Sequence, residues 1–135
     1  MDTETFTRIA KAVASANNYR LGYIAEPGVT PNFWRAEYTC RINYQDAKRY
    51  LLCSTDERWA VCSLVNYADS HQFEDCAEIA ATLKSFYGIE VETKADMDAE
   101  FELTVEISML SGFGASALRY WKPQTMGQAL FNWWD

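Results

Sequence analysis

The residues Phe33 to Asn43, which read FWRAEYTCRIN, decide the fold that we expect. Apolar and polar positions alternate without a break along this stretch. One set comprises Trp34, Ala36, Tyr38, Cys40 and Ile42, and the other comprises Arg35, Glu37, Thr39, Arg41 and Asn43. Because successive side chains of a strand point to opposite faces, this alternation predicts a strand with one buried face.

Shorter strand patterns flank this stretch on both sides. We predict strands at Tyr19 to Ala25, Lys48 to Ser54 and Trp59 to Tyr67, with turns at residues 44–47 and 55–58. The last of these strands is nearly apolar on both faces, which predicts a central place in the sheet. The short connections predict an antiparallel meander.

Three helices are expected around this sheet. The first covers Thr3 to Ala16, with Asp2 or Thr3 as its N-cap, and Asn17 and Asn18 end it. The second starts at a capping box of Asp69 and Gln72 and ends at Gly88, a residue suited to a left-handed C-terminal position. Its apolar stripe comprises Phe73, Cys76, Ile79, Ala80, Leu83 and Phe86. The third follows Pro123 and has capping-box spacing at Thr125 and Gln128.

Residues 89–109 predict a β-hairpin with one apolar and one strongly acidic face. Ile89, Val91 and Thr93 alternate with Glu90 and Glu92; after a loop at Asp96 to Ala99, Phe101, Leu103, Val105, Ile107 and Met109 alternate with Glu100, Glu102, Thr104 and Glu106. Pairing of the two strands would bring the glutamates onto one surface. Residues 115–121 fit either a strand or a helix.

These elements predict one α+β domain over residues 1–135. We expect an antiparallel sheet of five or six strands, made of the meander plus the hairpin, with two or three helices packed on it. The first two helices are expected on the same face of the sheet. The element order and acidity are similar to those of class I type III secretion chaperones, which implies a binding role; no motif residue carries this resemblance, and it assigns no site.

The composition limits the classes of partner and the cellular compartment that we expect. The chain has 12 basic and 19 acidic residues, a formal net charge of −7, and 49% hydrophobic residues. This charge argues against nucleic acid and against an anionic membrane surface as partners. The segment Met1 to Asn18 lacks a signal-peptide pattern. Cys40, Cys53, Cys62 and Cys76 all lie in periodic, buried-looking segments, so we expect reduced thiols and a cytoplasmic protein.

Residues for catalysis or for cofactor binding are not evident. The only histidine, His71, falls at the start of the second predicted helix, where we expect it to be exposed. The cysteine spacing matches no zinc frame, and Gly112 and Gly114 form only a lone G-x-G. We therefore predict no catalytic residue, no cofactor and no metal site.

Two features could bind a partner. The acidic hairpin face could dock a basic protein, although a solvated face is the alternative. The C-terminal tryptophans could form an interface or fix the last helix to its own domain. The candidate partner-binding residues are Glu90, Glu92, Glu100, Glu102, Glu106, Trp121, Trp133 and Trp134.

The predicted function is a non-enzymatic protein–protein interaction module of the assembly-factor, chaperone, immunity-protein or inhibitor type. One alternative is a small-ligand-binding protein or minor enzyme, with a pocket between the sheet and the aromatic C-terminal segment, lined by residues such as Trp34, Tyr38 and Trp121. Homodimerisation through the aromatic surface is a third possibility.

Overall fold

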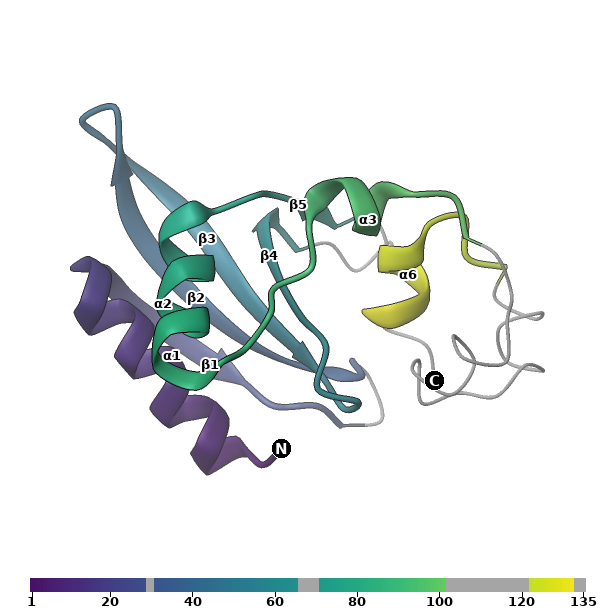
Figure 1. The fold of residues 1–135 in the computed structure, drawn as a ribbon, viewed down its shortest axis with the longest axis horizontal. Coiled ribbons are helices and arrows are strands. Elements are labelled where there is room, and N and C mark those ends of the chain that lie inside the picture. The colour runs from purple at the N-terminus through teal and green to yellow at the C-terminus, as the bar shows by residue number, and fades with distance from the viewer. Residues whose placement is uncertain (29–30, 66–70, 102–121, 133–135) are drawn as a thin grey trace.

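A computed structural model describes residues 1–28, 31–65, 71–101 and 122–132 (Figure 1). Five strands form one antiparallel sheet in the order β1-β2-β3-β4-β5, and four helices occur in the described part of the chain. The α+β class and the five-stranded antiparallel sheet are therefore confirmed. The elements are α1 (Thr3–Asn17), β1 (Arg20–Ala25), β2 (Phe33–Ile42), β3 (Gln45–Ser54), β4 (Trp59–Leu64), β5 (Gln72–Phe73), α2 (Ala77–Tyr87), α3 (Lys94–Asp98) and α6 (Met126–Leu130).

Helix α1 begins and ends as its sequence predicts. The Asp2 side chain accepts a hydrogen bond of 2.7 Å from the backbone N–H of Thr5, and Asn18 ends the helix in the left-handed conformation. The buried stripe of α1 faces the sheet and comprises Phe6, Ile9, Ala10, Val13 and Ala14. Burial of this stripe fixes the helix on the sheet.

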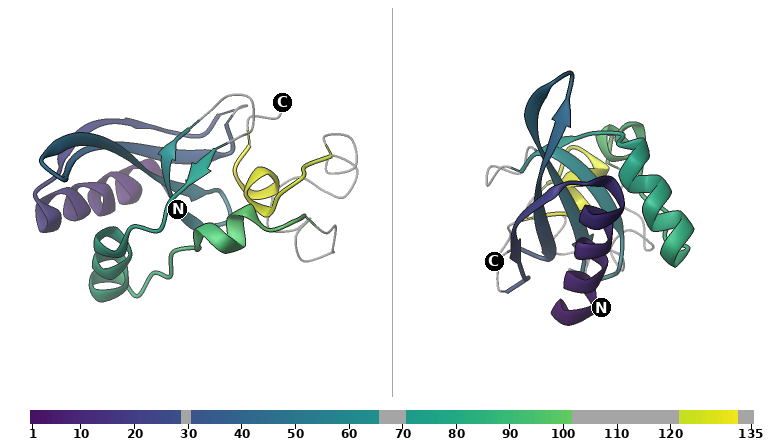
Figure 2. Two further views of the ribbon diagram at one scale, coloured as in Figure 1. Left: turned by 90° about the horizontal axis from the view of Figure 1, so that it is seen from above. Right: turned by 90° about the vertical axis from the view of Figure 1, so that its left-hand side faces the viewer.

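Helices α1 and α2 cover the same face of the sheet, as expected (Figures 1 and 2). Trp34, Ala36 and Tyr38 of β2 point into this layer and are buried. The alternation of β2 therefore identifies the main core. Trp34 Nε1 donates to Thr3 Oγ1 at 3.0 Å and Tyr38 Oη donates to the Ala10 carbonyl at 2.8 Å, so both polar atoms of these aromatic residues are hydrogen-bonded to α1.

A second apolar cluster covers the opposite face at one end of the β2–β3 hairpin. We call this end the base; it comprises residues 33–36 of β2 and 51–54 of β3. Phe33 and Leu52 pack there against residues from β4, β5, α3 and α6, namely Ala60, Cys62, Phe73, Met97, Leu130 and Phe131. Both faces of the sheet are therefore covered at the base. Strand β4 was predicted to be central; it is an interior strand next to the edge, between β3 and the two-residue β5.

Two buried asparagines join the base to the C-terminal segment. The Asn132 N–H donates to Asn32 Oδ1 at 2.8 Å, and Asn32 Nδ2 donates to the Leu130 carbonyl at 3.1 Å. The Asn32 N–H donates to the Asn132 carbonyl, also at 3.1 Å. Helix α6 precedes this clasp and has Thr125 as its predicted N-cap, because Thr125 Oγ1 accepts from the N–H of Gln128.

The second helix starts later than predicted. Gln72 and Phe73 form β5 instead, because Phe73 pairs with Cys62 of β4 and is buried in the second cluster. Helix α2 begins at Ala77 with Cys76 as its N-cap and ends at the left-handed Gly88, as expected. Phe86 lies outside the buried stripe and is 59% exposed. The predicted cap at Asp69 lies outside the described residues.

The described part of the predicted acidic hairpin does not form a strand pair. Val91 makes one isolated parallel bridge with Trp59, and Glu100 makes one with Thr125. The intervening residues fold as helix α3, whose N-cap Thr93 accepts from the N–H of Asp96 and whose Met97 is buried. This capped turn replaces the predicted loop and directs the chain towards α6; residues 102–109 lie outside the described part.

Candidate functional site

The distal half of the β2–β3 hairpin projects beyond the helices (Figures 1 and 2). We call residues 39–49 the finger. Its two strands pair from Thr39 with Lys48 to Ile42 with Gln45, so the hairpin turn contains only Asn43 and Tyr44. Both turn residues have positive φ, 52° and 63°, which is the pattern of a type I′ turn. The sequence predicted a turn slightly later, at residues 44–47.

Tyr44 occupies the tip of the finger. Its side chain is 91% exposed. Asparagine tolerates a left-handed backbone, but a tyrosine there carries a steric cost of roughly 1–2 kcal/mol. Because glycine would fit this turn position better and the ring has almost no intramolecular contact area, Tyr44 does not serve the stability of the turn.

The two faces of the finger differ in chemistry. On the outer face, Lys48 Nζ donates to Glu37 Oε1 at 3.1 Å and to Thr39 Oγ1 at 2.9 Å. Arg41 stands opposite Asp46, and its Nη2 donates to the Tyr44 carbonyl at 3.3 Å. On this face Lys48 is therefore ion-paired with Glu37, next to the finger, and Arg41 is bound to the backbone of the turn.

The inner face of the finger continues the face that carries Tyr38 in the core. Residues directly opposite one another share a face, so the inner face comprises Cys40, Ile42, Gln45, Ala47 and Arg49. Ile42 is 39% exposed and Gln45 is exposed. Helix α1 ends at Asn17 and α2 begins at Ala77, both near the root of the finger, so neither helix covers the inner face at the tip.

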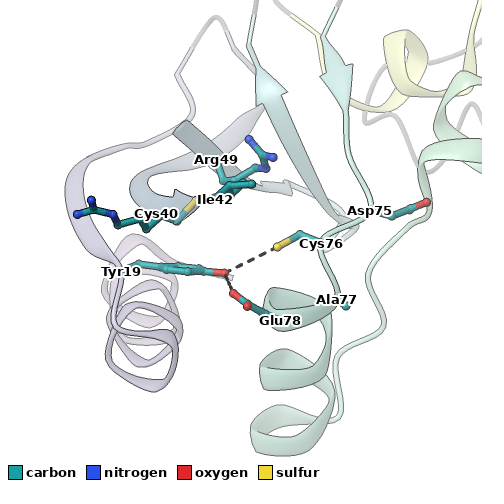
Figure 3. A pocket seen from close by; sticks show the side chains of 9 residues that line it. Tyr19, Cys40, Ile42, Arg49, Asp75, Cys76, Ala77 and Glu78 are labelled. Atoms are coloured by element: carbon teal, nitrogen blue, oxygen red, sulfur yellow. Dashed lines mark hydrogen bonds between the residues drawn. The ribbon is translucent and has the colours of Figure 1, made fainter. Parts of the chain in front are cut away.

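A pocket of about 270 Å³ lies at the root of the finger (Figure 3). Finger residues line one side and the start of α2 lines the other, with the ring of Tyr19 between them. The lining residues are Tyr19, Cys40, Arg41, Ile42, Arg49, Asp75, Cys76, Ala77 and Glu78.

Tyr19 connects the two sides of this pocket. Its hydroxyl donates to the carboxylate of Glu78 and lies 3.9 Å from Cys76 Sγ. Burial and the hydrogen bond to Glu78 raise the pKa of Tyr19 far above its usual value of 10, so the phenol stays protonated at neutral pH. Asp75 Oδ1 accepts from the N–H of Lys94 at 2.8 Å, which ties the rim of the pocket to α3. The pocket thus combines apolar side chains with two carboxylates, Asp75 and Glu78, and two guanidinium groups, Arg41 and Arg49.

The thiols serve packing. All four cysteines are free; Cys40, Cys53 and Cys62 are buried and Cys76 is half-buried. Burial raises the pKa of Cys40 and Cys62 and raises that of Cys53 to about 12, which keeps these thiols protonated and unreactive. Among the described residues, no group of three or more His, Cys, Asp or Glu side chains is arranged to hold a metal ion.

His71 is buried, contrary to the expectation of an exposed helix start. It lies at the base, where Nε2 donates to the Phe131 carbonyl at 3.1 Å and the ring makes edge contacts with Phe33 and Phe73. Burial lowers its pKa from 6.5 to about 4, and the positive charge of Arg35 acts in the same direction. No local pattern predicts this burial, because it depends on the formation of β5.

The predicted partner-binding glutamates do not share one acidic face in the described part of the chain. Glu92 is ion-paired with Arg58, with 2.6 Å between its Oε1 and Nε of Arg58, and is largely buried by that contact. Glu90 is exposed and paired with Lys84, and Glu100 is exposed beside α6. Glu102, Glu106, Trp121, Trp133 and Trp134 lie outside the described residues.

Two of the residues predicted to line a ligand pocket lie elsewhere. Trp34 and Tyr38 are buried in the core under α1, so they cannot line a pocket beside the C-terminal segment. The finger and the pocket at its root were missed by sequence reasoning. The turn signal near Tyr44 was visible, but the reach of the finger beyond the helices depends on where α1 ends and α2 begins in space.

Comparison with protein-family models, with curated proteins and with solved structures found no match to this chain. The described helices include none that is long and apolar enough to cross a membrane.

Proposed function

We propose that this chain is a non-enzymatic protein-binding module that docks through the finger. The observation that carries the proposal is the tip: Tyr44 combines 91% exposure with a left-handed backbone. Both features disfavour the isolated fold, and strained backbone together with an exposed aromatic side chain is characteristic of residues that act on something outside the chain. Tyrosine is also one of the residues that most often dominate binding energy in protein interfaces.

The finger has the composition of a docking element. Its outer face is polar and its inner face carries Ile42 and Ala47 without a covering helix at the tip. It contains three basic residues, Arg41, Lys48 and Arg49, against one acidic residue, Asp46, in a chain whose net charge is −7. This balance favours a partner that presents acidic side chains to the finger.

The proposal places the docking surface away from the predicted acidic face. Glu92 would have to give up Arg58 in order to contact a basic partner, and removing one member of a largely buried pair is costly. The pocket at the root of the finger is also slightly smaller than the roughly 300–1,000 Å³ typical of small-ligand sites. Its size suits one inserted side chain.

A cytoplasmic location is part of the proposal. Four free cysteines, three of them buried, suit a reducing compartment.

Photo-crosslinking in cells tests the proposal. The full chain would carry p-benzoylphenylalanine in place of Tyr44, and in a matched control in place of Tyr87, which is 40% exposed on α2. We expect crosslinked protein products from position 44 and few from position 87. Equal products from both positions, or none from position 44, would contradict a docking role for the finger.

A further inference from the structure

We infer that the partner adds a strand to the finger: an extended segment of the partner protein pairs with the backbone of β3 at residues 45–49 and brings a carboxylate to Arg49. This inference rests on the proposed function and names how the finger docks. Extended segments that join a sheet edge gain main-chain hydrogen bonds, and pockets beside the edge select their side chains.

Strand β3 has an open edge along the finger. The pairing of β4 with β3 ends at Cys62 and Tyr50, and β4 then continues along β5. Within the described residues no strand pairs with residues 45–49 on that side, and the finger projects beyond the helices (Figures 1 and 2). The finger is therefore a two-stranded ribbon, and such ribbons are marginally stable in water without a third strand.

The hairpin turn fixes which backbone groups point to the open edge. The two residues that flank a type I′ turn are hydrogen-bonded to each other. Because bonded and non-bonded pairs alternate along an antiparallel ladder, Ala47 and Arg49 also bond to β2. Asp46 and Lys48 lie between them and direct their N–H and carbonyl groups to the open edge. These groups are the donors and acceptors that an extended segment would use.

Arg49 places a positive charge beside this edge. Its Nη1 donates to the outward-pointing carbonyl of Lys48 at 2.7 Å, and among the described residues it forms no ion pair. The pocket carboxylates, Asp75 and Glu78, already accept hydrogen bonds from donors of this chain. Asp46, the only acidic residue of the finger, lies on the outer face. The inner side of the edge therefore favours a segment that carries an aspartate or a glutamate.

The pocket at the root of the finger lies beside the same residues (Figure 3). Arg49 lines it from the finger, and Cys76 and Ala77 line it from the start of α2. Every second side chain of an added strand would point to the inner face, where Arg49, Ala47 and Ile42 lie. One of these side chains can enter the pocket of about 270 Å³ while an acidic one contacts Arg49.

Hydrogen exchange of the purified full chain, resolved by residue with NMR and corrected for intrinsic rates, tests the open edge. We expect fast exchange at the amides of Asp46 and Lys48. The amides of Ala47 and Arg49, which bond to β2, should exchange at least tenfold more slowly. Equal protection at all four positions would show that the edge is covered in the isolated chain and would overturn the inference.

The same measurement on the complex tests the added strand. The protein captured by p-benzoylphenylalanine at position 44 is identified by mass spectrometry, purified and mixed with the wild-type chain. We expect exchange at Asp46 and Lys48 to slow at least tenfold, and the crosslinked segment of the partner to contain an aspartate or a glutamate. Unchanged exchange in a saturated complex, or a crosslinked segment without an acidic residue, would overturn the inference.

Two pairs of variants separate the backbone from the side chains. Lys48→Pro removes an N–H from the open edge, whereas Lys48→Ala removes the same side chain and keeps the N–H. The proline variant should bind the captured protein at least tenfold more weakly than the alanine variant. Arg49→Gln should bind at least threefold more weakly than Lys11→Gln, a control on the exposed surface of α1. Equal affinities within either pair of folded variants would overturn the inference.

Circular dichroism shows whether each variant is folded, and if the proline variant is not, the exchange measurement on the wild-type complex decides. If position 44 captures a protein whose complex leaves the open edge exchanging freely, this inference fails and the proposed function stands. If position 44 captures no protein at all, both fail.

Discussion

The base and the finger are two halves of the same hairpin with opposite environments. At the base, Phe33, Leu51, Leu52 and Cys53 are fully buried, because helices and strands cover both faces of the sheet. In the finger, the same two strands continue with the same alternation, yet residues 41–46 are all exposed. The alternation shows which side chains share a face, whereas elements distant in sequence decide whether that face is covered.

The largest expected effect is the difference in unfolding free energy between a substitution at the base and one in the finger, both in strand β2. Phe33→Ala leaves a cavity among Phe131, His71 and the residues of the second cluster, and should lower the free energy of unfolding by about 3–5 kcal/mol. Ile42→Ala, in the same strand but 39% exposed, should cost less than about 1 kcal/mol. Urea unfolding of both variants at neutral pH measures the difference. Equal losses would show that the finger is as well packed as the base.

Acid should weaken the base before it affects the finger. The pKa of His71 is about 4 in the folded chain and 6.5 in the unfolded chain, so between these values the unfolded state binds more protons. The contribution of His71 to stability is therefore complete above pH 6.5 and declines as pH falls towards 4. The total change is about 3 kcal/mol, from the cost of 1.36 kcal/mol per pKa unit.

His71→Gln provides the comparison for this prediction. Glutamine keeps an N–H donor for the Phe131 carbonyl and has no proton to gain. Unfolding free energies measured from pH 6.5 to about 4 should fall less steeply in the variant than in the wild type. Identical slopes would assign the acid sensitivity to other groups.

The smallest expected effect is an increase in the free energy of unfolding, on replacing Tyr44 by glycine. Tyr44→Gly removes the left-handed strain of roughly 1–2 kcal/mol but adds backbone freedom to the unfolded chain, which costs about 0.5–1 kcal/mol. The net result should be a gain of up to about 1.5 kcal/mol in stability, together with loss of binding through the finger. Thermal unfolding measures the change in stability, and co-purification of cellular proteins with the variant and with the wild type measures the loss of binding. A destabilised variant would mean that the ring of Tyr44 does pack on its own chain.

Local patterns predicted much of the fold. The alternation of Phe33 to Asn43, the caps Asp2 and Thr125, and the C-terminal Gly88 depend on neighbours within a few residues, and the structure confirms all of them. The start of α2 was wrong because pairing of Phe73 with Cys62 overrides the local helix pattern. The same long-range pairing buried His71.

The candidate site depends on contacts between segments distant in sequence, which local sequence patterns do not predict. Tyr44 could be placed near a turn, but its reach past α1 and α2 is set by three-dimensional packing. Tyr19, Cys76 and Glu78 come together from segments more than 50 residues apart, and no spacing motif relates them. The predicted hairpin at residues 89–109 had regular alternation, yet Thr93 capped a helix within it.

The asparagine clasp has a consequence for the order of folding. Asn32 and Asn132 are separated by 100 residues, so the base can close only after nearly the whole described chain has been synthesised. The finger needs only contacts between adjacent strands and can form within microseconds. We therefore expect a nascent chain to display a formed finger above an open, apolar base. Folding kinetics of Asn32→Ala would show this as faster unfolding with little change in the folding rate.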